Sequence, residues 1–243
     1  MPKVTLAIET SGRSGRIALR IDGHNLDERE LSQAGRRHAQ TLVLEIRDLL
    51  ADHGVAPADI DLVAGSEGPG SFTGLRVGVV CAKMLAWANG SDLAMVDTLL
   101  AIAAESPHDV SRVEIVSDAQ REDVFLGIYA AADASTDTGQ SRAWQRSGSI
   151  EIAKVEAWAH SLTSRKSDGF AIAGPGVEKA AEFLPDRIRQ LDRPNSEPSA
   201  ATIARLGEQL AEAGQLADPM TAEPFYLRKS AAEEKRDAAQ NRL

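Results

Sequence analysis

Glu9-Thr10-Ser11-Gly12 places a carboxylate and two hydroxyl groups directly after an apolar run. A turn of this kind at the end of a strand can hold a metal-bound water or a phosphate. No basic residue nearby is placed to meet a phosphate, so the favoured interpretation is a hairpin turn with a half-buried glutamate. Glu9, Thr10 and Ser11 are therefore carried forward only as candidate nucleotide-binding residues.

Two glycine-rich turns provide the other candidates. The first, from Gly68 to Gly74, precedes a predicted helix and offers free backbone N–H groups that can bind an anion. It is not a P-loop, because neither Lys-Ser nor Lys-Thr follows Gly74. The second, Gly174-Pro175-Gly176, can approach an adenosine closely, which makes Gly174 and Gly176 candidate nucleotide-binding residues. A lone glycine-rich turn does not by itself identify a ligand.

The remaining residues do not assemble into a complete active site. The sequence contains no Gly-x-Ser-x-Gly, and its five histidines form neither His-x-x-x-His nor His-Glu-x-x-His. Cys81 is the single cysteine, which excludes an internal disulfide and a cysteine-based metal site. We therefore predict no catalytic residue and no metal site, and interpret Cys81 as an inert core residue.

Composition limits the partners. With 27 basic and 36 acidic side chains the formal charge is -9, and no long basic run is present, which argues against this chain alone holding a nucleic acid. Proteins or small molecules are the expected partners, and we expect no binding to DNA or to a membrane. No signal peptide and no run of 18 apolar residues is found, so a cytoplasmic protein is expected.

Hydrophobic periodicity predicts an α/β protein. In residues 1–106, three strands form a meander with Asp22-Gly23 as the first hairpin turn, and helices and strands then alternate, which favours a mixed sheet covered by helices. The expected strands are Val4–Glu9, Gly15–Ile21, Asn25–Leu31, Ile60–Gly65 and Leu93–Val96, and the expected helices are Arg37–His53, Thr73–Ala88 and Leu99–Ala104.

A second half is predicted over residues 107–198. Its expected strands are Val113–Ser117, Val124–Ala130, Gln145–Glu151, Phe170–Ala173 and one near Ile188–Leu191, with a helix over Val155–Ser161 and a short one ending at Leu184. Residues 199–220 contain an amphipathic helix that Ser199 caps and that we expect to pack back on the body. Residues 221–243 form a C-terminal segment with a charged tail.

The helix predicted from Thr73 contains a ridge of small residues. Gly74, Gly78, Ala82 and Ala86 recur every fourth residue and therefore lie on one face. Each interior glycine costs about 1 kcal/mol relative to alanine, so another backbone must come close to this face. That backbone belongs either to this chain's own sheet and helices or to a second protein, and the sequence leaves both interpretations open.

Several motifs, spread over nearly the whole chain, resemble those of the bacterial TsaB family. The most specific is Gly68-Pro69-Gly70-Ser71-Phe72-Thr73-Gly74-Leu75-Arg76-Val77-Gly78. The others are Leu6-Ala7-Ile8-Glu9-Thr10-Ser11, Arg37-His38-Ala39-Gln40-Thr41-Leu42, Asp118-Ala119-Gln120-Arg121-Glu122-Asp123-Val124-Phe125 and Pro224-Phe225-Tyr226-Leu227-Arg228.

This resemblance implies an actin-like ATPase (ribonuclease H-like) fold of two related α/β halves. It also implies a part in making threonylcarbamoyladenosine beside the anticodon of tRNA. Proteins of this family are similar to the catalytic subunit TsaD but are catalytically inactive themselves. They pair with TsaD, and the pair works with the ATPase TsaE. A separate enzyme makes the threonylcarbamoyl-adenylate donor. The implied role is a non-catalytic scaffold that meets tRNA only through the complex, with ATP or ADP bound only there.

The sequence agrees with the implied lack of catalytic activity, and it departs from the family pattern at several positions. TsaD-like proteins carry a metal-binding His-x-x-x-His where this chain has Thr98 and Ile102, and isoleucine cannot bind a metal. Glu9 replaces a more usual aspartate, which puts a nucleotide role for this residue in doubt. Milder departures are Ala39, Gln120 and Phe125.

Family members pair with TsaD through the two helices of the first half, here Arg37–His53 and Thr73–Ala88. We expect one flank of each helix to cover the sheet and the other to contact the partner, with a homodimer through the same surface when the partner is absent. A bulky residue at Gly78 should then block pairing and leave the monomer folded. The predicted interface residues are His38, Leu42, Ser71, Phe72, Gly74, Arg76, Gly78 and Ala82.

Three other functions remain open at this point. A nucleotide phosphotransferase of the sugar-kinase class would bind ATP without a partner. A metallopeptidase, or an inactive peptidase-like homodimer, is disfavoured by the missing ligand pair. A homodimeric scaffold unrelated to tRNA would recover no tRNA-modifying partner in a pull-down.

Overall fold

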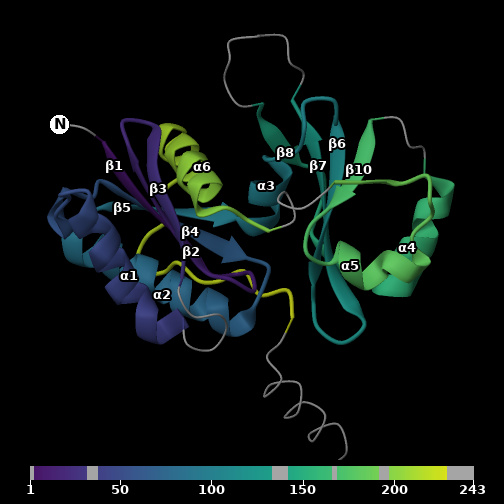
Figure 1. Cartoon of the computed structure of the whole chain (residues 1–243), viewed down its shortest axis with the longest axis horizontal. Helices are drawn as coiled ribbons and strands as arrows, with labels where there is room; N and C mark the ends of the chain where they lie inside the picture. The colour runs from purple at the N-terminus through teal and green to yellow at the C-terminus, as the bar shows by residue number, and fades with distance from the viewer. Residues whose placement is uncertain (1–2, 32–37, 133–141, 166–168, 192–196, 229–243) are drawn as a thin grey trace, which may run out of the picture.

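The computed structural model describes residues 3–31, 38–132, 142–165, 169–191 and 197–228, with only the backbone given for 38–40. The chain forms two α/β halves that lie side by side (Figure 1). The predicted loop at 133–142 lies almost entirely outside the described residues, and the charged end of the C-terminal segment lies wholly outside them.

The first half is built on a mixed sheet with the order β3-β2-β1-β4-β5. β1 (Val4–Glu9), β2 (Arg16–Ile21) and β3 (His24–Glu30) form the antiparallel meander, and β4 (Leu62–Gly68) and β5 (Asp92–Asp97) continue it in parallel. β1 is buried along its whole length because helices cover both faces of the central strands. The predicted hairpin turn is confirmed, with φ of 50° at Asp22 and 76° at Gly23.

The second half repeats this connectivity. β6 (Arg112–Asp118), β7 (Asp123–Ala131) and β8 (Trp144–Arg146) are antiparallel, and β10 (Phe170–Ala173) and β11 (Arg189–Gln190) add to β6 in parallel, giving β11-β10-β6-β7-β8. Both sheets therefore place a three-stranded meander beside two parallel strands in the same order. This repeated order confirms the expected actin-like architecture of two related halves.

One predicted strand is wrong. Gln145–Glu151 is not continuous: β8 ends at Arg146 and β9 (Glu151–Lys154) begins after a turn at Gly148, whose φ is 89°. Both strands pair with β7, but at opposite ends of it. A positive φ at Gly148 turns the chain between the two strands, so they do not form one continuous strand.

The helices form layers around the two sheets (Figure 1). α1 (His38–Asp52) and α2 (Phe72–Asn89) cover one face of the first sheet, and α6 (Ala200–Glu212) returns from the second half to cover the other. α3 (Thr98–Ala103) lies between the halves, while α4 (Val155–Ser161) and α5 (Val177–Ala180) pack on the second sheet. Short 3₁₀ turns occupy Pro57–Asp59, Leu162–Ser164 and Ala181–Phe183.

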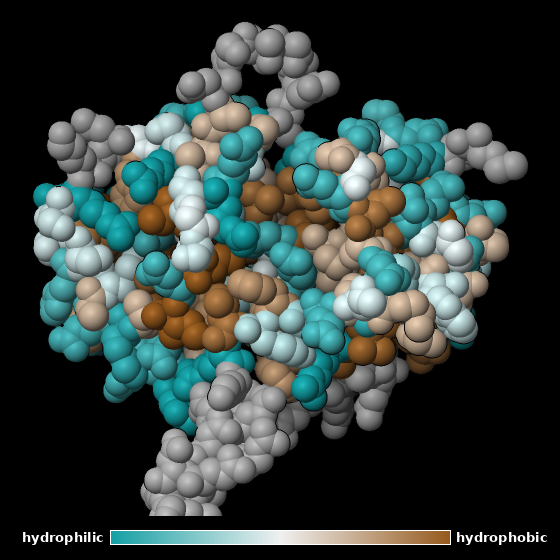
Figure 2. Space-filling model, turned by 180° about the vertical axis from the view of Figure 1, so that it is seen from behind, coloured by the Kyte–Doolittle hydropathy of each residue, from teal (hydrophilic) through white to brown (hydrophobic). Residues whose placement is uncertain are grey.

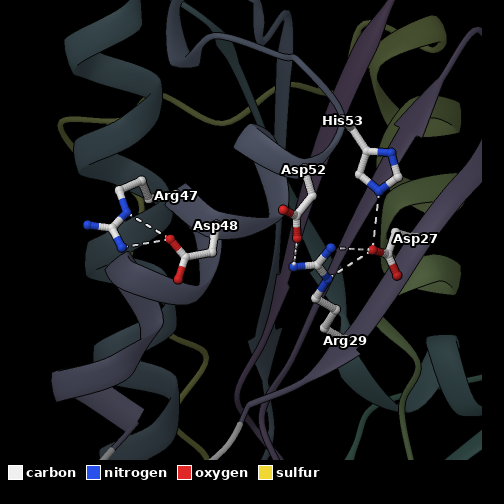
Figure 3. Close-up of polar contacts among 6 residues, drawn as sticks. All are labelled: Asp27, Arg29, Arg47, Asp48, Asp52 and His53. Atoms are coloured by element: carbon white, nitrogen blue, oxygen red, sulfur yellow. Dashed lines mark hydrogen bonds and ion pairs between the residues drawn. The ribbon is translucent and has the colours of Figure 1, made fainter.

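Charged residues fix the end of α1 against strand β3 (Figure 3). The Arg29 guanidinium bridges Asp27, at 2.7 Å, and Asp52, at 2.9 Å, and His53 Nε2 lies 3.2 Å from Asp27 Oδ2. Although partial burial raises the pKa of Asp27, hydrogen bonds from Arg29 and His53 outweigh this and lower it. The contacts tie the last turn of α1 to the sheet edge, so α1 holds a fixed position beside α2.

Polar and apolar residues divide the surface unevenly. On the face opposite to that of Figure 1, hydrophobic residues gather in patches along the middle and hydrophilic residues surround them (Figure 2). In the part of the chain that the structure describes, no helix combines the length and the apolar character that crossing a membrane requires.

Candidate partner-binding surface on α1 and α2

Helix α2 begins and ends within one residue of its predicted bounds. The Ser71 hydroxyl caps the first turn by accepting a hydrogen bond from the Gly74 N–H at 3.3 Å, and Gly90 ends the helix in the left-handed region at φ 68°. The Ser71 N–H donates to the Ser11 carbonyl at 2.8 Å. These contacts hold the start of α2 against the turn that follows β1.

The ridge of small residues faces this chain's own sheet. A Cβ on Gly74 would lie 1.9 Å from the Thr10 carbonyl oxygen, and one on Gly78 would lie 2.1 Å from the Thr10 Oγ1. A Cβ on Gly65 of β4 would lie 3.4 Å from the Cβ of Ala82. The glycines therefore let α2 approach β1 and β4, which is the intramolecular interpretation of the ridge.

This burial corrects the predicted interface at four positions. Gly74, Gly78 and Ala82 lie beneath α2, and Leu42 of α1 is in the same core with 1% of its surface exposed. None of the four is available to a second protein in this fold. The geometry also argues against the expectation that a bulky residue at Gly78 leaves the monomer folded, because the added side chain would collide with Thr10.

The turn after β1 directs its polar groups inward. The Ser11 N–H and hydroxyl both donate to Glu9 Oε1 at 2.5 Å, and the Thr10 hydroxyl donates to the Gly74 carbonyl at 2.8 Å. Burial raises the pKa of Glu9, and the hydrogen bonds from Ser11 offset part of that rise. With these donors used internally and α2 packed on Thr10, the geometry does not fit a bound phosphate. Nucleotide binding by Glu9, Thr10 and Ser11 stays a prediction that the geometry does not support.

The second candidate turn occupies the equivalent place in the other half. Gly174-Pro175-Gly176 comes directly after β10, and Gly68-Pro69-Gly70 begins at the last residue of β4; Gly174 and Gly68 have φ of 108° and 116°. A Cβ on Gly174 would lie 2.4 Å from the Val116 carbonyl oxygen. Close packing on β6 thus explains this glycine without a ligand, and Gly176 donates its N–H to the same carbonyl at 2.9 Å.

The outer flanks of α1 and α2 carry large apolar side chains that nothing in the described chain covers. On α2, Val80, Met84 and Trp87 are 57%, 56% and 63% exposed. They follow Arg76 at spacings of four, four and three residues, so they form one stripe on the side opposite to the ridge. On the neighbouring α1, Val43 and Leu44 are 64% and 50% exposed. We call these five residues the apolar face.

An aromatic and cationic cluster lies at the N-terminal end of this stripe. Phe72 stacks on Tyr226 with ring centroids 4.7 Å apart, and the Arg76 guanidinium lies 4.3 Å from the Phe72 ring centroid. Arg76 Nε donates to the Tyr226 hydroxyl at 3.1 Å. Of the predicted interface residues, Ser71, Phe72 and Arg76 thus lie at least partly on the surface. The side chain of His38 lies outside the described residues.

A partly buried polar cluster joins the two halves. Asp97 of β5 caps α3 through Oδ1, and its Oδ2 accepts hydrogen bonds from Tyr129 at 2.8 Å and Arg146 at 3.1 Å. Burial and the charge of Asp97 raise the pKa of Glu67 to about 7, although Arg146 lowers it. Glu67, Asp97, Trp144 and Arg205 are among the residues that line a cleft of about 340 Å³ between the halves.

Thr98 and Ile102, which the family resemblance aligns with the histidine pair of TsaD-like proteins, are used here for a hydrogen bond and for packing. The Thr98 hydroxyl accepts a hydrogen bond from the Gly68 N–H at 3.1 Å, and Ile102 is 1% exposed in the core of the second half. Among the described residues, no group of three or more His, Cys, Asp and Glu side chains is arranged to hold a metal ion.

The apolar face was not singled out from the sequence. The glycine spacing of α2 predicts the ridge of small residues, and Val80, Met84 and Trp87 lie about half a turn away from that ridge. A helical projection would have shown that both flanks of α2 are free of charged residues beyond Arg76 and Lys83. Tyr226 joins the surface from 150 residues away and gives no local signal.

Comparison with known proteins places the chain in a family. The model of the family described as "TsaD: tRNA N6-adenosine threonylcarbamoyltransferase" matches residues 28–236. The tRNA threonylcarbamoyladenosine biosynthesis protein TsaB of Escherichia coli is 28% identical over 93% of this chain and 95% of that protein, and its namesake in Haemophilus influenzae is 27% identical over 92% of each. The solved structure of YeaZ from Pseudomonas aeruginosa is similar over 93% of this chain and 100% of that one, with a TM-score of 0.77 and 28% identity.

Proposed function

The chain belongs to the TsaB family of TsaD-related proteins, and from this premise we propose that it is the non-catalytic partner of a TsaD-type subunit in the biosynthesis of threonylcarbamoyladenosine in tRNA. In this role the chain supports transfer of the threonylcarbamoyl group to the adenosine beside the anticodon. It acts by binding the catalytic subunit through α1 and α2.

The apolar face carries this proposal. Two adjacent helices present Val43, Leu44, Val80, Met84 and Trp87 to solvent, each at least half exposed. Large exposed apolar side chains on neighbouring helices are typical of protein–protein contacts, and tryptophan is a common hot-spot residue. Family membership indicates a TsaD-type protein as the partner, and we propose that it contributes an equivalent pair of helices from its own first half.

Two features support a role without catalysis. The positions of the TsaD histidine pair hold Thr98 and Ile102, which pack the junction of the two halves. The turn after β1 is filled by α2 and directs its donors to Glu9 and Gly74. We therefore assign TsaE, and ATP or ADP, to the assembled complex and not to this chain alone. The net charge of -9 supports contact with tRNA through the complex only.

Titration calorimetry with TsaD from the same organism tests the proposal. Trp87→Ala and Val80→Glu should each weaken binding by about 30-fold or more, which corresponds to about 2 kcal/mol at a hot spot. Ile152→Glu is the matched control, because Ile152 is 39% exposed on β9, which pairs with β7 in the sheet of the second half. Wild-type affinity in both surface variants, or no binding by the wild type, would overturn the proposal.

The same face should bring two copies of the chain together when TsaD is absent, because a two-fold contact uses one patch twice. Sedimentation of the isolated chain should show a dimer that dissociates on dilution. Addition of TsaD should convert it to a heterodimer, and Val80→Glu should give a monomer. A dimer that persists in Val80→Glu would place the contact elsewhere.

A further inference from the structure

Residues 222–228, which we call the strap, cross from the first half of the molecule to the second. The Lys83 ammonium donates to the Ala222 carbonyl, and the Phe225 N–H donates to the Glu67 carbonyl at 2.7 Å. At the far end, Arg228 donates to the Ala119 carbonyl at 2.7 Å and lies 3.2 Å from Asp123. The strap is thus anchored on α2 and β4 in one half and on the β6–β7 turn in the other.

The backbone of the first half is shaped to receive the strap. Gly68 ends β4 with φ of 116°, and a Cβ on it would lie 2.9 Å from the Phe225 carbonyl oxygen. Beyond this point Leu227 packs against the apolar core of the second half. A segment of irregular backbone that makes contacts in both halves restrains their relative position, because moving one half would break contacts at one end.

Between its two anchors the strap contributes to the surface of α2. Tyr226 is 39% exposed, stacks on Phe72 and accepts a hydrogen bond from Arg76. Arg76 begins the stripe that continues through Val80, Met84 and Trp87. Arg76 is exposed and makes no ion pair with the described residues, so it is free to meet a carboxylate.

We propose that the strap forms one end of the partner-binding surface and couples partner binding to the relative position of the two halves. The occupant is the TsaD-type subunit, presenting apolar residues to the face and a carboxylate to Arg76. This inference rests on the proposed function. Its physical basis is that Tyr226 holds Arg76 in place only while the strap is anchored at both ends, so loosening either anchor adds an ordering cost to binding.

The decisive variant is Arg228→Ala, which removes the polar contacts of the strap in the second half, keeps the packing of Leu227 and leaves every residue of the apolar face unchanged. We expect TsaD to bind this variant about 5- to 10-fold more weakly, within the usual range of allosteric coupling. Tyr226→Ala should weaken binding further, and Tyr226→Phe should restore most of the affinity because the ring stack remains. Arg189→Ala is the control, since Arg189 pairs with Asp109 at the edge of the second sheet.

Hydrogen exchange gives the second readout. Adding TsaD to the wild type should protect the amide of Phe225 and the amides of the β6–β7 turn, as well as those of α2. Protection confined to α1 and α2, together with wild-type affinity in Arg228→Ala, would overturn the strap inference while leaving the proposed function intact. A wild-type chain that does not bind TsaD at all would overturn both.

Discussion

Adding a methyl group at Gly78 should destabilise the protein, although the same change in an open helix stabilises it. An exposed helical glycine gains about 1 kcal/mol on replacement by alanine. Here the new Cβ would lie 2.1 Å from Thr10 Oγ1, more than 1 Å inside ordinary contact distance. Overpacking of this kind costs about 3 kcal/mol, so we expect Gly78→Ala to lower the free energy of unfolding by about 2 kcal/mol.

The atom with which the new methyl group collides, Thr10 Oγ1, can be removed by a second substitution. Thr10→Ala deletes Oγ1 and with it the hydrogen bond to the Gly74 carbonyl, at a cost of about 1 kcal/mol. Its Cβ would still lie 3.4 Å from the new methyl group, which is ordinary contact. Without the collision the added methyl group keeps its helix gain of about 1 kcal/mol, so the double variant should be about 1 kcal/mol more stable than Thr10→Ala alone, with a coupling energy of about 3 kcal/mol. Gly74→Ala should not be rescued, because its methyl group meets the main-chain oxygen of Thr10 at 1.9 Å.

Urea unfolding followed by circular dichroism measures all of these variants. Gly12→Ala is the control, because its nearest neighbour is the Ser14 oxygen at 3.7 Å and the change should be within about 0.5 kcal/mol of the wild type. A more stable Gly78→Ala, or strict additivity in the double variant, would refute the conclusion that the ridge packs on β1. In that case the ridge would again be available to a second protein.

Two further predictions concern the junction of the halves and the start of α2. The pKa of Glu67 rises from 4.5 to about 7 on folding, so the folded state holds its proton more tightly and stability should fall as pH increases from about 4.5 to about 7. Glu67→Gln should remove this pH dependence in urea titrations and stabilise the protein at pH 8 by about 2 kcal/mol; an unchanged pH profile would contradict the burial of the charge. Ser71→Ala should lower the unfolding free energy by about 1 kcal/mol through loss of the α2 cap, whereas Ser71→Asp should retain stability. Equal losses in both Ser71 variants would show that the cap is not the cause.

Local signals in the sequence were sufficient for most of the secondary structure. The run Val4–Glu9, the Asp22-Gly23 turn and the cap at Ser199 each depend on neighbours in the chain, and the structure confirms all three. The exception is the segment from Gln145 to Glu151, where Gly148 breaks what alternation alone predicted to be one strand. The family resemblance, carried by motifs spread along the chain, correctly indicated two related halves.

The sequence alone did not determine which face of each helix is buried. Spacing showed that Gly74 and Gly78 share one side of α2, but two backbones could fit there equally well, that of β1 or that of another protein. Only the tertiary structure shows that Thr10 packs against Gly74 and Gly78 and that Trp87 faces solvent. The same holds for Tyr226, which reaches Phe72 and Arg76 because the strap crosses both halves. Periodicity is a property of one helix, whereas burial depends on what the rest of the chain brings to it.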